Sequence, residues 1–456
     1  MKEYDVIVIG SGSGMYIVDE ALTEGLKVAL VEKGPLGGTC LNVGCIPSKM
    51  LIYPADIIAE IQEAKKLGIT AEINSIDFNS IMDRMRRSVQ EEQDHMRRGI
   101  RESRNLDFYE AEGRFIEDYT IEVKGEKIRG QKIFIVAGAR PSIPPIKGID
   151  KIDYLTNESV LKLNKRPRSM AIVGGGYIAA EYGHFFAAMD TRVTILQRNI
   201  RLVPDEEPEI SELLKRELGK RMDIYTNMEV TEAKKEGDNN IVIGRERSTG
   251  RERSFEVEKV LIASGRTSNA DLLKVEKTGV EVDERGFIKA NEYLETSKKN
   301  IWALGDVIGK EMFRHVANRE AGIAWHNSMH EHKVKMDYTA APHAVFSHPQ
   351  IASVGLTEEE AKKNHRILVG KARYYDVAKG EAMMETEGFA KALVEKDTWK
   401  ILGFHVIGPE APTVIQEVIN AMANQGDIWS VDRGMHIHPA LPELVITTFQ
   451  DLREPQ

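Results

Sequence analysis

Cysteine is almost absent from this sequence: only two of its 456 residues are cysteines, Cys40 and Cys45. This scarcity argues against a fold held by structural disulfides and favours a reducing, cytoplasmic compartment, where a disulfide is expected to be transient and catalytic. Long apolar runs are also missing. No segment approaches the roughly 18 residues of a membrane span, and the apolar segment from Val6 to Ile9 is too short for a signal-peptide core.

Positive charge is not in excess either, because the net charge is −9. We therefore expect no nucleic-acid partner and no membrane partner. With 42% hydrophobic and 29% charged residues, the composition is that of an ordinary globular protein. At about 100 to 200 residues per domain, the length predicts three or so domains.

The two cysteines lie in a glycine-rich stretch that runs from Gly37 to Lys49. Five residues of a regular helix advance roughly 7.5 Å and turn by about 140°, so the Cα atoms would lie beyond the roughly 4.4 to 6.8 Å that a disulfide tolerates. The spacing predicts a distorted helix, with Gly44 supplying backbone freedom. We interpret the pair as a redox-active disulfide. A structural disulfide and a Cys2His2 metal site completed by His436 and His438 are the alternatives.

A dinucleotide-binding pattern precedes this stretch. Tyr4 to Ile9 predicts a buried strand, Gly10 to Gly14 a glycine turn that opens a helix, and Lys27 to Glu32 a second strand. Such glycines let the backbone approach a pyrophosphate, and the acid at the end of the second strand accepts from a ribose hydroxyl. Met15 stands where a third glycine is usual, so we expect the helix to lie slightly further from the strand.

A second copy of the pattern begins after Pro167. Met170 to Val173 predicts the strand and Gly174 to Gly176 the turn, but the next strand, Arg192 to Leu196, ends at Gln197-Arg198 instead of an acid. Because a 2′-phosphate prefers an arginine where a free ribose prefers a carboxylate, these residues and Arg201 favour NADPH.

The remaining segments alternate between predicted strands and helices. A charge-rich helical stretch is expected from Tyr53 to Asn105, with a solvated charged face at Asp83 to Arg87, and a proline-rich linker from Pro141 to Pro145. Further strands are predicted at Phe108 to Ala111, Thr120 to Val123, Lys132 to Val136, Val260 to Arg266, Asn300 to Asp306, Ala344 to Phe346 and Lys391 to Val394, and a further helix at Thr413 to Asn424.

Taken together, these motifs resemble the class I pyridine nucleotide-disulfide oxidoreductases, which include dihydrolipoamide dehydrogenase, glutathione reductase, mycothione reductase and mercuric reductase. The Gly38 to Lys49 stretch and the ending His438-Pro439 to Glu443 are the most specific. The segments that begin at His315, His348, Asp376 and His438 look most like the mycothione reductase branch, whereas His436 is similar to dihydrolipoamide dehydrogenase. Mercuric reduction is disfavoured, since the chain lacks a C-terminal cysteine pair and an N-terminal metal-binding extension.

The resemblance implies an α/β fold with two Rossmann-like dinucleotide-binding domains, for FAD and for NAD(P), and a C-terminal α+β dimerisation domain. The expected divisions are 1–145 for the first part of the FAD domain, 146–268 for the NAD(P) domain, 269–336 for the second part of the FAD domain and 337–456 for the dimerisation domain. The resemblance also implies a homodimer, whose C-terminal domain lends a His-Glu pair to the other subunit.

The resemblance also implies which residues contact the cofactors. His315 would begin a helix aimed at the flavin pyrimidine edge, and Tyr177 would cover the nicotinamide pocket. For FAD the residues are Gly10, Gly12, Ser13, Gly14, Glu32, Lys33, Gly38, Thr39, Lys49, Gly113, Ala137, Gly138, Arg266, Gly305, Asp306 and His315. For NADPH or NADH they are Gly174, Gly176, Tyr177, Ile178, Glu181, Gln197, Arg198 and Gly265.

The catalytic roles implied by the resemblance fall on six residues. Cys45 would lie nearer the flavin, with Lys49 paired to Glu181 beside it. Cys40 would be the interchange thiol, and His438, oriented by Glu443, would be the general acid and base that a thiolate leaving group needs. No metal is expected.

We therefore predict an enzyme that passes electrons from NAD(P)H through FAD and the Cys40-Cys45 disulfide to a low-molecular-weight disulfide (EC 1.8.1.-), with a role in cell redox homeostasis. The alternative is an NAD+-linked dihydrolipoamide dehydrogenase of a 2-oxoacid dehydrogenase or glycine cleavage system, whose substrate is a dithiol. A more distant alternative is a non-catalytic metal-binding or redox-sensing protein.

Overall fold

The structure is a computed structural model that describes residues 1–455. It comprises two compact units. The first unit contains residues 1–48, 82–142 and 265–337, and the second contains residues 49–81, 143–264 and the chain from 338 onward.

The first unit is built on a seven-stranded sheet in which β1 lies between β2 and β6. Val6, Ile7 and Val8 of β1 are fully buried, as expected of a central parallel strand covered on both faces. The order β3-β2-β1-β6-β16 is parallel, and β4 and β5 extend the first half of β6 in the antiparallel sense. The strands are β1 (Lys2–Ile9), β2 (Val28–Glu32), β3 (Leu106–Glu110), β4 (Gly113–Glu117), β5 (Thr120–Val123), β6 (Glu126–Ile135) and β16 (Ile301–Ala303).

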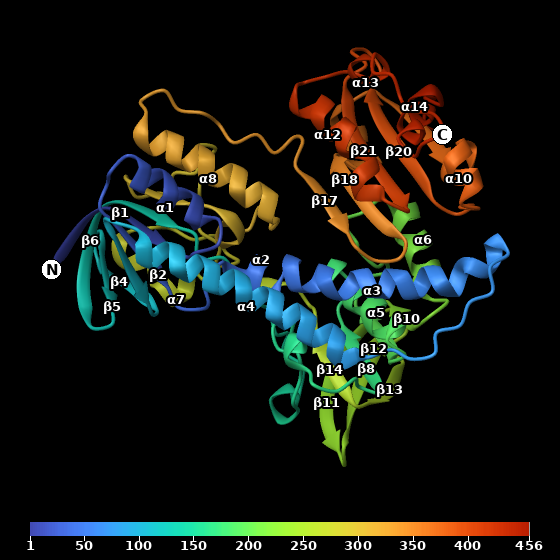
Figure 1. Cartoon of the computed structure of the whole chain (residues 1–456), viewed down its shortest axis with the longest axis horizontal. Helices are drawn as coiled ribbons and strands as arrows, with labels where there is room; N and C mark the ends of the chain where they lie inside the picture. Colours follow the sequence, from blue (N-terminus) through green and yellow to red (C-terminus); the bar gives the residue numbers. More distant parts are fainter. Residues whose placement is uncertain (456) are drawn as a thin grey trace. The chain divides into compact units, whose positions relative to one another are not determined.

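Two helices of this unit, α1 (Gly14–Thr23) and α8 (Arg314–Met329), lie side by side (Figure 1). The segment from Tyr53 to Asn105, predicted as helical, is mostly helical but interrupted at residues 68–77. It contains the end of α3 (Cys45–Glu63), the short η1 (Ala64–Leu67) and α4 (Phe78–Glu102). Gly68 ends the first part in a left-handed conformation, with φ of 81°. The solvated face of α4 is confirmed, because Asp83, Arg84 and Arg87 are exposed while Met85 is buried.

The predicted linker begins where the chain leaves the first unit. There β7 (Ala139–Pro141) pairs in the antiparallel sense with β15 (Arg266–Ser268), so the departing and returning segments lie next to each other.

The second unit contains a four-stranded parallel sheet in the order β10-β9-β8-β14, and α5 (Tyr177–Ala188) follows β8. A three-stranded antiparallel sheet, which the sequence did not predict, lies between β10 and β14 along the chain. The elements of these sheets are β8 (Ser169–Val173), β9 (Arg192–Gln197), α6 (Pro208–Leu218), β10 (Asp223–Thr226), β11 (Met228–Glu236), β12 (Asn239–Glu246), β13 (Glu252–Val257) and β14 (Lys259–Ile262).

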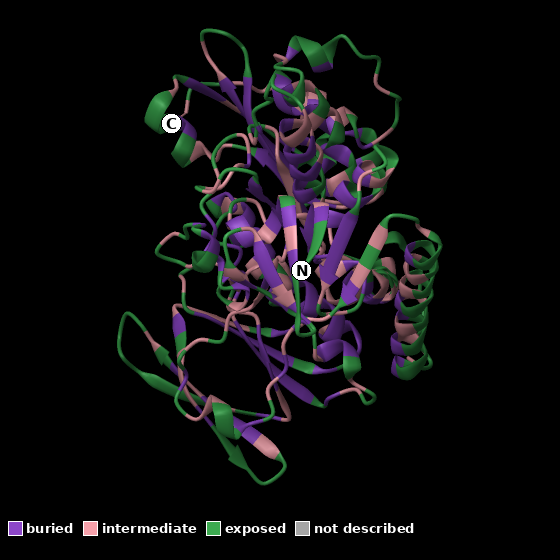
Figure 2. Cartoon of the chain, turned by 90° about the vertical axis from the view of Figure 1, so that its left-hand side faces the viewer, coloured by how far each residue is buried: buried purple, intermediate pink, exposed green. Residues whose placement is uncertain are grey.

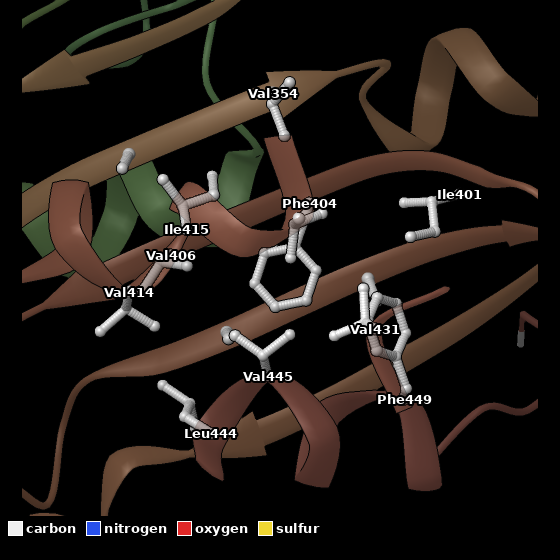
Figure 3. Close-up of a cluster of buried hydrophobic side chains, with 14 of the residues drawn as sticks. Val354, Ile401, Phe404, Val406, Val414, Ile415, Val431, Leu444, Val445 and Phe449 are labelled. Atoms are coloured by element: carbon white, nitrogen blue, oxygen red, sulfur yellow. The ribbon is translucent and has the colours of Figure 1, made fainter. Parts of the chain in front are cut away.

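The C-terminal part of the second unit is a five-stranded antiparallel sheet in the order β17-β18-β21-β20-β19. α14 packs on β19 and β20, and α12 packs on β21. Phe404 of β21 lies at the centre of their core, among Val406, Ile415 and Val445 (Figure 3). The elements are β17 (Pro342–Val345), β18 (Gln350–Gly355), α9 (Glu358–Asn364), β19 (Ile367–Arg373), α10 (Ala378–Ala382), β20 (Phe389–Glu395), β21 (Ile401–Gly408), α11 (Ala411–Val414), α12 (Gln416–Ala423), α13 (Trp429–Asp432) and α14 (Glu443–Gln450).

Burial follows these sheets. In Figure 2 the buried residues run along the strands, whereas exposed residues gather at loops and hairpin ends. Among residues 1–455, none of the helices combines the length and the apolar composition of a membrane span.

One cation is buried where β20 meets the start of α6. The Nζ of Lys391 lies 2.8 Å from Glu207, 3.1 Å from Glu209 and 2.6 Å from Glu358. Burial alone would lower the pKa of Lys391, but the hydrogen bonds with Glu207 and Glu358 outweigh it and raise the pKa. This ammonium therefore stays charged and ties the C-terminal sheet to the segment that follows β9.

Replacing Lys391 with methionine is expected to lower the free energy of unfolding by about 3–5 kcal/mol, because the buried carboxylate of Glu207 loses its counter-charge. Chemical denaturation of the purified protein measures the change. The matched control is Lys147→Met, since Lys147 has a side chain 78% exposed and pairs with Glu232 at 3.0 Å. The control should change stability by less than about 1 kcal/mol. Equal effects of both replacements would contradict this account.

Candidate functional site

The cysteine stretch folds as two helices and not as one. α2 (Gly38–Val43) ends at Gly44, whose φ of −131° and ψ of −119° are not helical, and α3 starts again at Cys45. A Cβ on Gly44 would lie 2.9 Å from the Thr39 oxygen and 3.2 Å from the Cys40 Cα. The predicted distortion is confirmed, and the close approach explains why this residue has no side chain.

The break brings the two sulfur atoms into contact. Both cysteines are free thiols in the structure, with Cys40 half-buried and Cys45 exposed. The hydrogen bond with Cys45 and burial raise the pKa of the Cys40 thiol, and the charge of Arg314 opposes them. The structure thus describes a dithiol, and the redox-active disulfide stays a prediction.

Glycines form a narrow backbone cradle at the end of β1. Gly10 has φ of 108°, and a Cβ there would lie 2.3 Å from the Val136 oxygen. Gly38 has φ of 63°, and its Cβ would lie 2.8 Å from the Cα of Gly12. Two chain segments therefore approach each other without side chains next to the N-terminus of α1, as a bound pyrophosphate requires.

The wider spacing expected from Met15 is wrong, because the close contact of helix and strand occurs one residue earlier. A Cβ on Gly14 would lie 2.8 Å from the Val8 side chain, while Met15 is only partly buried. Gly14 therefore allows the close packing of helix on strand that the third glycine of the pattern usually allows.

The carboxylate of Glu32 fixes the glycine turn from the end of β2. One of its oxygens accepts from the N–H and the hydroxyl of Ser11, both at 2.8 Å, and the other accepts from the N–H of Gly34 at 2.8 Å. The hydroxyl of Ser13 donates to Asn318 of α8 at 2.9 Å.

Asp306 lies just beyond β16, in η5 (Gly305–Ile308). Its carboxylate is 3.2 Å from the Arg266 guanidinium, which also donates to the Ala139 oxygen. Burial raises the pKa of Asp306, and the charge of Arg266 opposes this shift.

The first unit also contains the other residues predicted for FAD, Lys49 excepted. They are Lys33 directly after β2, Thr39 in α2, Gly113 at the start of β4, Ala137 and Gly138 between β6 and β7, Gly305 at the start of η5, and His315 in the first turn of α8.

The second glycine turn repeats the geometry of the first. Gly174 has φ of 122°, and a Cβ there would lie 2.2 Å from the Ala263 oxygen. Gly176 is the N-cap of α5, and Tyr177 and Ile178 form its first turn, with Tyr177 37% exposed. Gly265, also predicted for NAD(P), belongs to the first unit and has φ of 110°.

The end of β9 differs from the expectation in one respect. Gln197 is buried, packs against Gly175 and donates its amide N–H to the Arg201 oxygen at 3.2 Å. Arg198, in contrast, is exposed. Of these two residues at the strand end, only Arg198 has an exposed side chain.

Lys49 and Glu181 form a bidentate ion pair between α3 and α5. The Nζ of Lys49 lies 2.9 Å from both carboxylate oxygens, and Glu181 is buried. Phe346 also contacts this pair, a role that the sequence did not predict. Its N–H donates to Glu181 at 3.0 Å, and the centre of its ring lies 4.4 Å from the Lys49 Nζ.

His438 and Glu443 are joined by a hydrogen bond of 2.8 Å at His438 Nδ1. The other oxygen of Glu443 accepts from the Ala440 N–H at 2.9 Å, and these two bonds, that of Ala440 first, lower the pKa of Glu443. His438 is 71% exposed in its side chain, and it belongs to the second unit while the cysteines belong to the first.

His436 is held differently, by a 2.8 Å contact with Glu417. Within the described residues, no three side chains of His, Cys, Asp or Glu gather closely enough to hold a metal ion.

The chain was compared with known proteins. The family model "Pyridine nucleotide-disulphide oxidoreductase" matches residues 4–321, and the dimerisation domain of the same family matches residues 341–448. Mycothione reductase of Mycobacterium tuberculosis is 35% identical, over 99% of this chain and 100% of that protein. Dihydrolipoyl dehydrogenase of Bacillus subtilis is 33% identical, over 97% of this chain and 96% of that protein.

A solved structure is similar over its whole length. The Cu(II) complex of the HOCl-induced flavoprotein disulfide reductase RclA of Escherichia coli superposes with a TM-score of 0.88 at 28% identity, covering 99% of each chain.

A methyl group at Gly10 is expected to abolish flavin binding, because it would clash with the Val136 oxygen where the cradle must stay open. We predict that Gly10→Ala purifies with less than about a tenth of the wild-type flavin, measured by absorbance at about 450 nm, since overpacking at backbone cannot relax cheaply. Gly25→Ala is the matched control: Gly25 also has positive φ, 74°, but open space around it. Gly25→Ala introduces backbone strain but no steric clash, so this control should keep its flavin. Flavin retained by Gly10→Ala would contradict the assignment.

Proposed function

The chain belongs to the pyridine nucleotide-disulphide oxidoreductase family, and from this membership we propose that it reduces a low-molecular-weight disulfide with NADPH. The observation that supports the proposal most is the contact of the Cys40 and Cys45 thiols at the start of α3, the helix that also carries Lys49 to its buried partner Glu181. A dithiol can donate two electrons to an external disulfide.

The first glycine cradle fits a bound FAD, since a Cβ at Gly10 or Gly38 would fill it. The residues proposed to hold FAD are those of the cradle, Glu32, Asp306 and Lys49. FAD, when bound, supplies the two-electron chemistry that links a nicotinamide to the sulfur pair. We assign residues 1–145 and 269–336 to this cofactor, 146–268 to the nicotinamide nucleotide and 337–456 to dimerisation.

The sulfur chemistry balances as two exchanges. The Cys40 thiolate attacks one sulfur of the substrate disulfide, whose S–S bond breaks, and the leaving thiolate takes a proton from His438. The Cys45 thiolate then attacks Cys40, releasing the second thiol and closing the Cys40–Cys45 disulfide. Glu443 holds Nδ1 of His438, which leaves Nε2 for proton transfer.

We propose a homodimer in which the His438–Glu443 pair of one subunit serves the cysteines of the other. The match to the family's dimerisation domain supports it. So does the segment around His438, where Met435 and Ile437 are 101% and 79% exposed in the single chain. Apolar side chains this exposed favour an interface.

NADPH is proposed over NADH because of the end of β9. A carboxylate there would bind a free ribose, but Gln197 is neutral and buried and Arg198 is exposed. Dihydrolipoamide dehydrogenase with NAD+ is the second candidate, favoured by the dihydrolipoyl dehydrogenase relatives and by His436, which neighbours the catalytic candidate His438.

Steady-state turnover distinguishes these candidates. We expect NADPH to be oxidised faster than NADH with a small thiol disulfide, and little turnover with lipoamide. A strong preference for NAD+ and dihydrolipoamide would overturn the proposal in favour of the second candidate. A colourless protein that contains zinc would overturn both.

His438→Gln is expected to slow turnover by about 10²- to 10⁴-fold through loss of general acid-base catalysis, while anaerobic flavin reduction by NADPH keeps its wild-type rate. Glu443→Gln should have a smaller effect. The lowered pKa of Glu443 keeps its carboxylate ionised from about pH 6 to about pH 9, so the wild-type pH-rate profile should show no step from Glu443 in that range. Stopped-flow and pH-rate measurements test both. A wild-type turnover rate in His438→Gln would remove His438 from the mechanism.

A further inference from the structure

A second polar contact joins α3 to α5, beyond the Lys49–Glu181 pair. His184 lies three residues after Glu181 on α5, and Asp56 lies seven residues after Lys49 on α3. The Nε2 of His184 is 2.8 Å from the Asp56 carboxylate. His184 is completely buried, and the proposed chemistry does not use it.

The donors and acceptors fix the state of this histidine. Nδ1 of His184 lies 3.1 Å from a terminal nitrogen of Arg221. Because a guanidinium can only donate, Nδ1 must be the acceptor, and the ring proton is on Nε2, where it donates to Asp56. A second proton, on Nδ1, would make the ring a cation in contact with the Arg221 guanidinium. His184 is therefore a neutral bridge between a carboxylate and a guanidinium, unsuited to acid-base work.

Arg221 extends the bridge to the loop between β17 and β18. Its other terminal nitrogen donates to the His348 oxygen at 2.7 Å, and His348 contacts Glu63 at 3.0 Å. This loop is the one whose Phe346 N–H binds Glu181. Both ends of the short segment 346–348 are thus tied to α5, once through Glu181 and once through His184 and Arg221.

Two contacts between α3 and α5 fix how the helices are rotated and shifted relative to each other. One contact alone would leave the helices free to rotate about it. On α3 the partners are two turns apart, and on α5 about one turn apart. A change at the His184 contact would therefore tilt or slide α5 and shift Glu181, which holds Lys49. α5 also carries Tyr177 and Ile178, the residues proposed to meet the nicotinamide.

We propose that His184, held by Asp56 and Arg221, is a positioning residue that sets the register of α5 on α3 for electron entry from the nicotinamide nucleotide. The inference rests on the proposed function, because it concerns the same nucleotide and the same ion pair. His184 touches neither substrate nor cofactor and acts through Glu181 and Lys49.

His184→Phe keeps a ring but removes both hydrogen bonds. We expect anaerobic flavin reduction by NADPH to slow about 10- to 100-fold, because a misplacement of about 1 Å can reduce a rate by that much. Reoxidation of the prereduced enzyme by the small disulfide should change by less than about twofold, because the sulfur exchange uses Cys40 and Cys45 at the break between α2 and α3 and does not use the nicotinamide nucleotide. Stopped-flow absorbance measures both half-reactions. His184→Gln, which can still donate to Asp56, should recover part of the lost rate.

The control is His365→Phe, since His365 makes a contact of the same length, 2.8 Å from Nδ1 to Glu395, away from α5. It should leave both half-reactions unchanged.

If His184→Phe does not fold, Asp56→Asn and His184→Gln give the same test, with slower flavin reduction supporting the proposal and a wild-type rate of reduction overturning it. Equal slowing of both half-reactions by His184→Phe would also overturn it. If neither NADPH nor NADH reduces the wild-type enzyme, both the proposed function and this inference are overturned. If the wild-type enzyme is reduced normally and His184→Phe is reduced at the same rate, only this inference is overturned.

Discussion

The contact of two sulfur atoms five residues apart is the constraint on which the site depends. A continuous helix cannot make it, because the Cα atoms would be too far apart and on different faces. Gly44 resolves the conflict by leaving the helical conformation against Thr39 and Cys40, so closely that no side chain fits. The helix that restarts at Cys45 also carries Lys49 and Asp56.

Glu181 is the second constraint, since a buried carboxylate is costly unless it is paired and hydrogen-bonded. Lys49 supplies the opposite charge with both oxygens in reach, and the Phe346 N–H supplies a further donor. The ion pair and the hydrogen bond of this one carboxylate thus bring together α3, α5 and the loop before β18. These segments are far apart in the sequence, and a buried polar group lies at their meeting point.

How far the sequence predicts such a site depends on the range of the interactions. The strands around the glycine turns were predictable because burial on both faces leaves near-continuous apolar runs, and the break at Gly44 followed from local geometry alone. The Lys49–Glu181 pair came only through the family resemblance. Phe346 and Asp56 gave no signal, because their partners lie more than a hundred residues away. Arg221 gave none either, because its partners, His184 and His348, lie 37 and 127 residues away. β11 and β13 were missed for another reason: both are rich in charged, exposed residues and lack a clear apolar alternation.

The two glycine turns show how one backbone solution accommodates strand ends of different charge. Gly10 and Gly174 have nearly the same φ, 108° and 122°, and each would place a Cβ on the carbonyl oxygen that follows a neighbouring strand, Val136 or Ala263. This shared requirement is imposed by the close turn itself and does not select a ligand. The strand ends differ: Glu32 keeps a carboxylate bound to the turn, whereas Gln197 turns its amide inward and leaves Arg198 exposed. The electrostatic difference between the sites therefore arises from one or two side chains at the end of the second strand, on a scaffold whose glycines must stay the same.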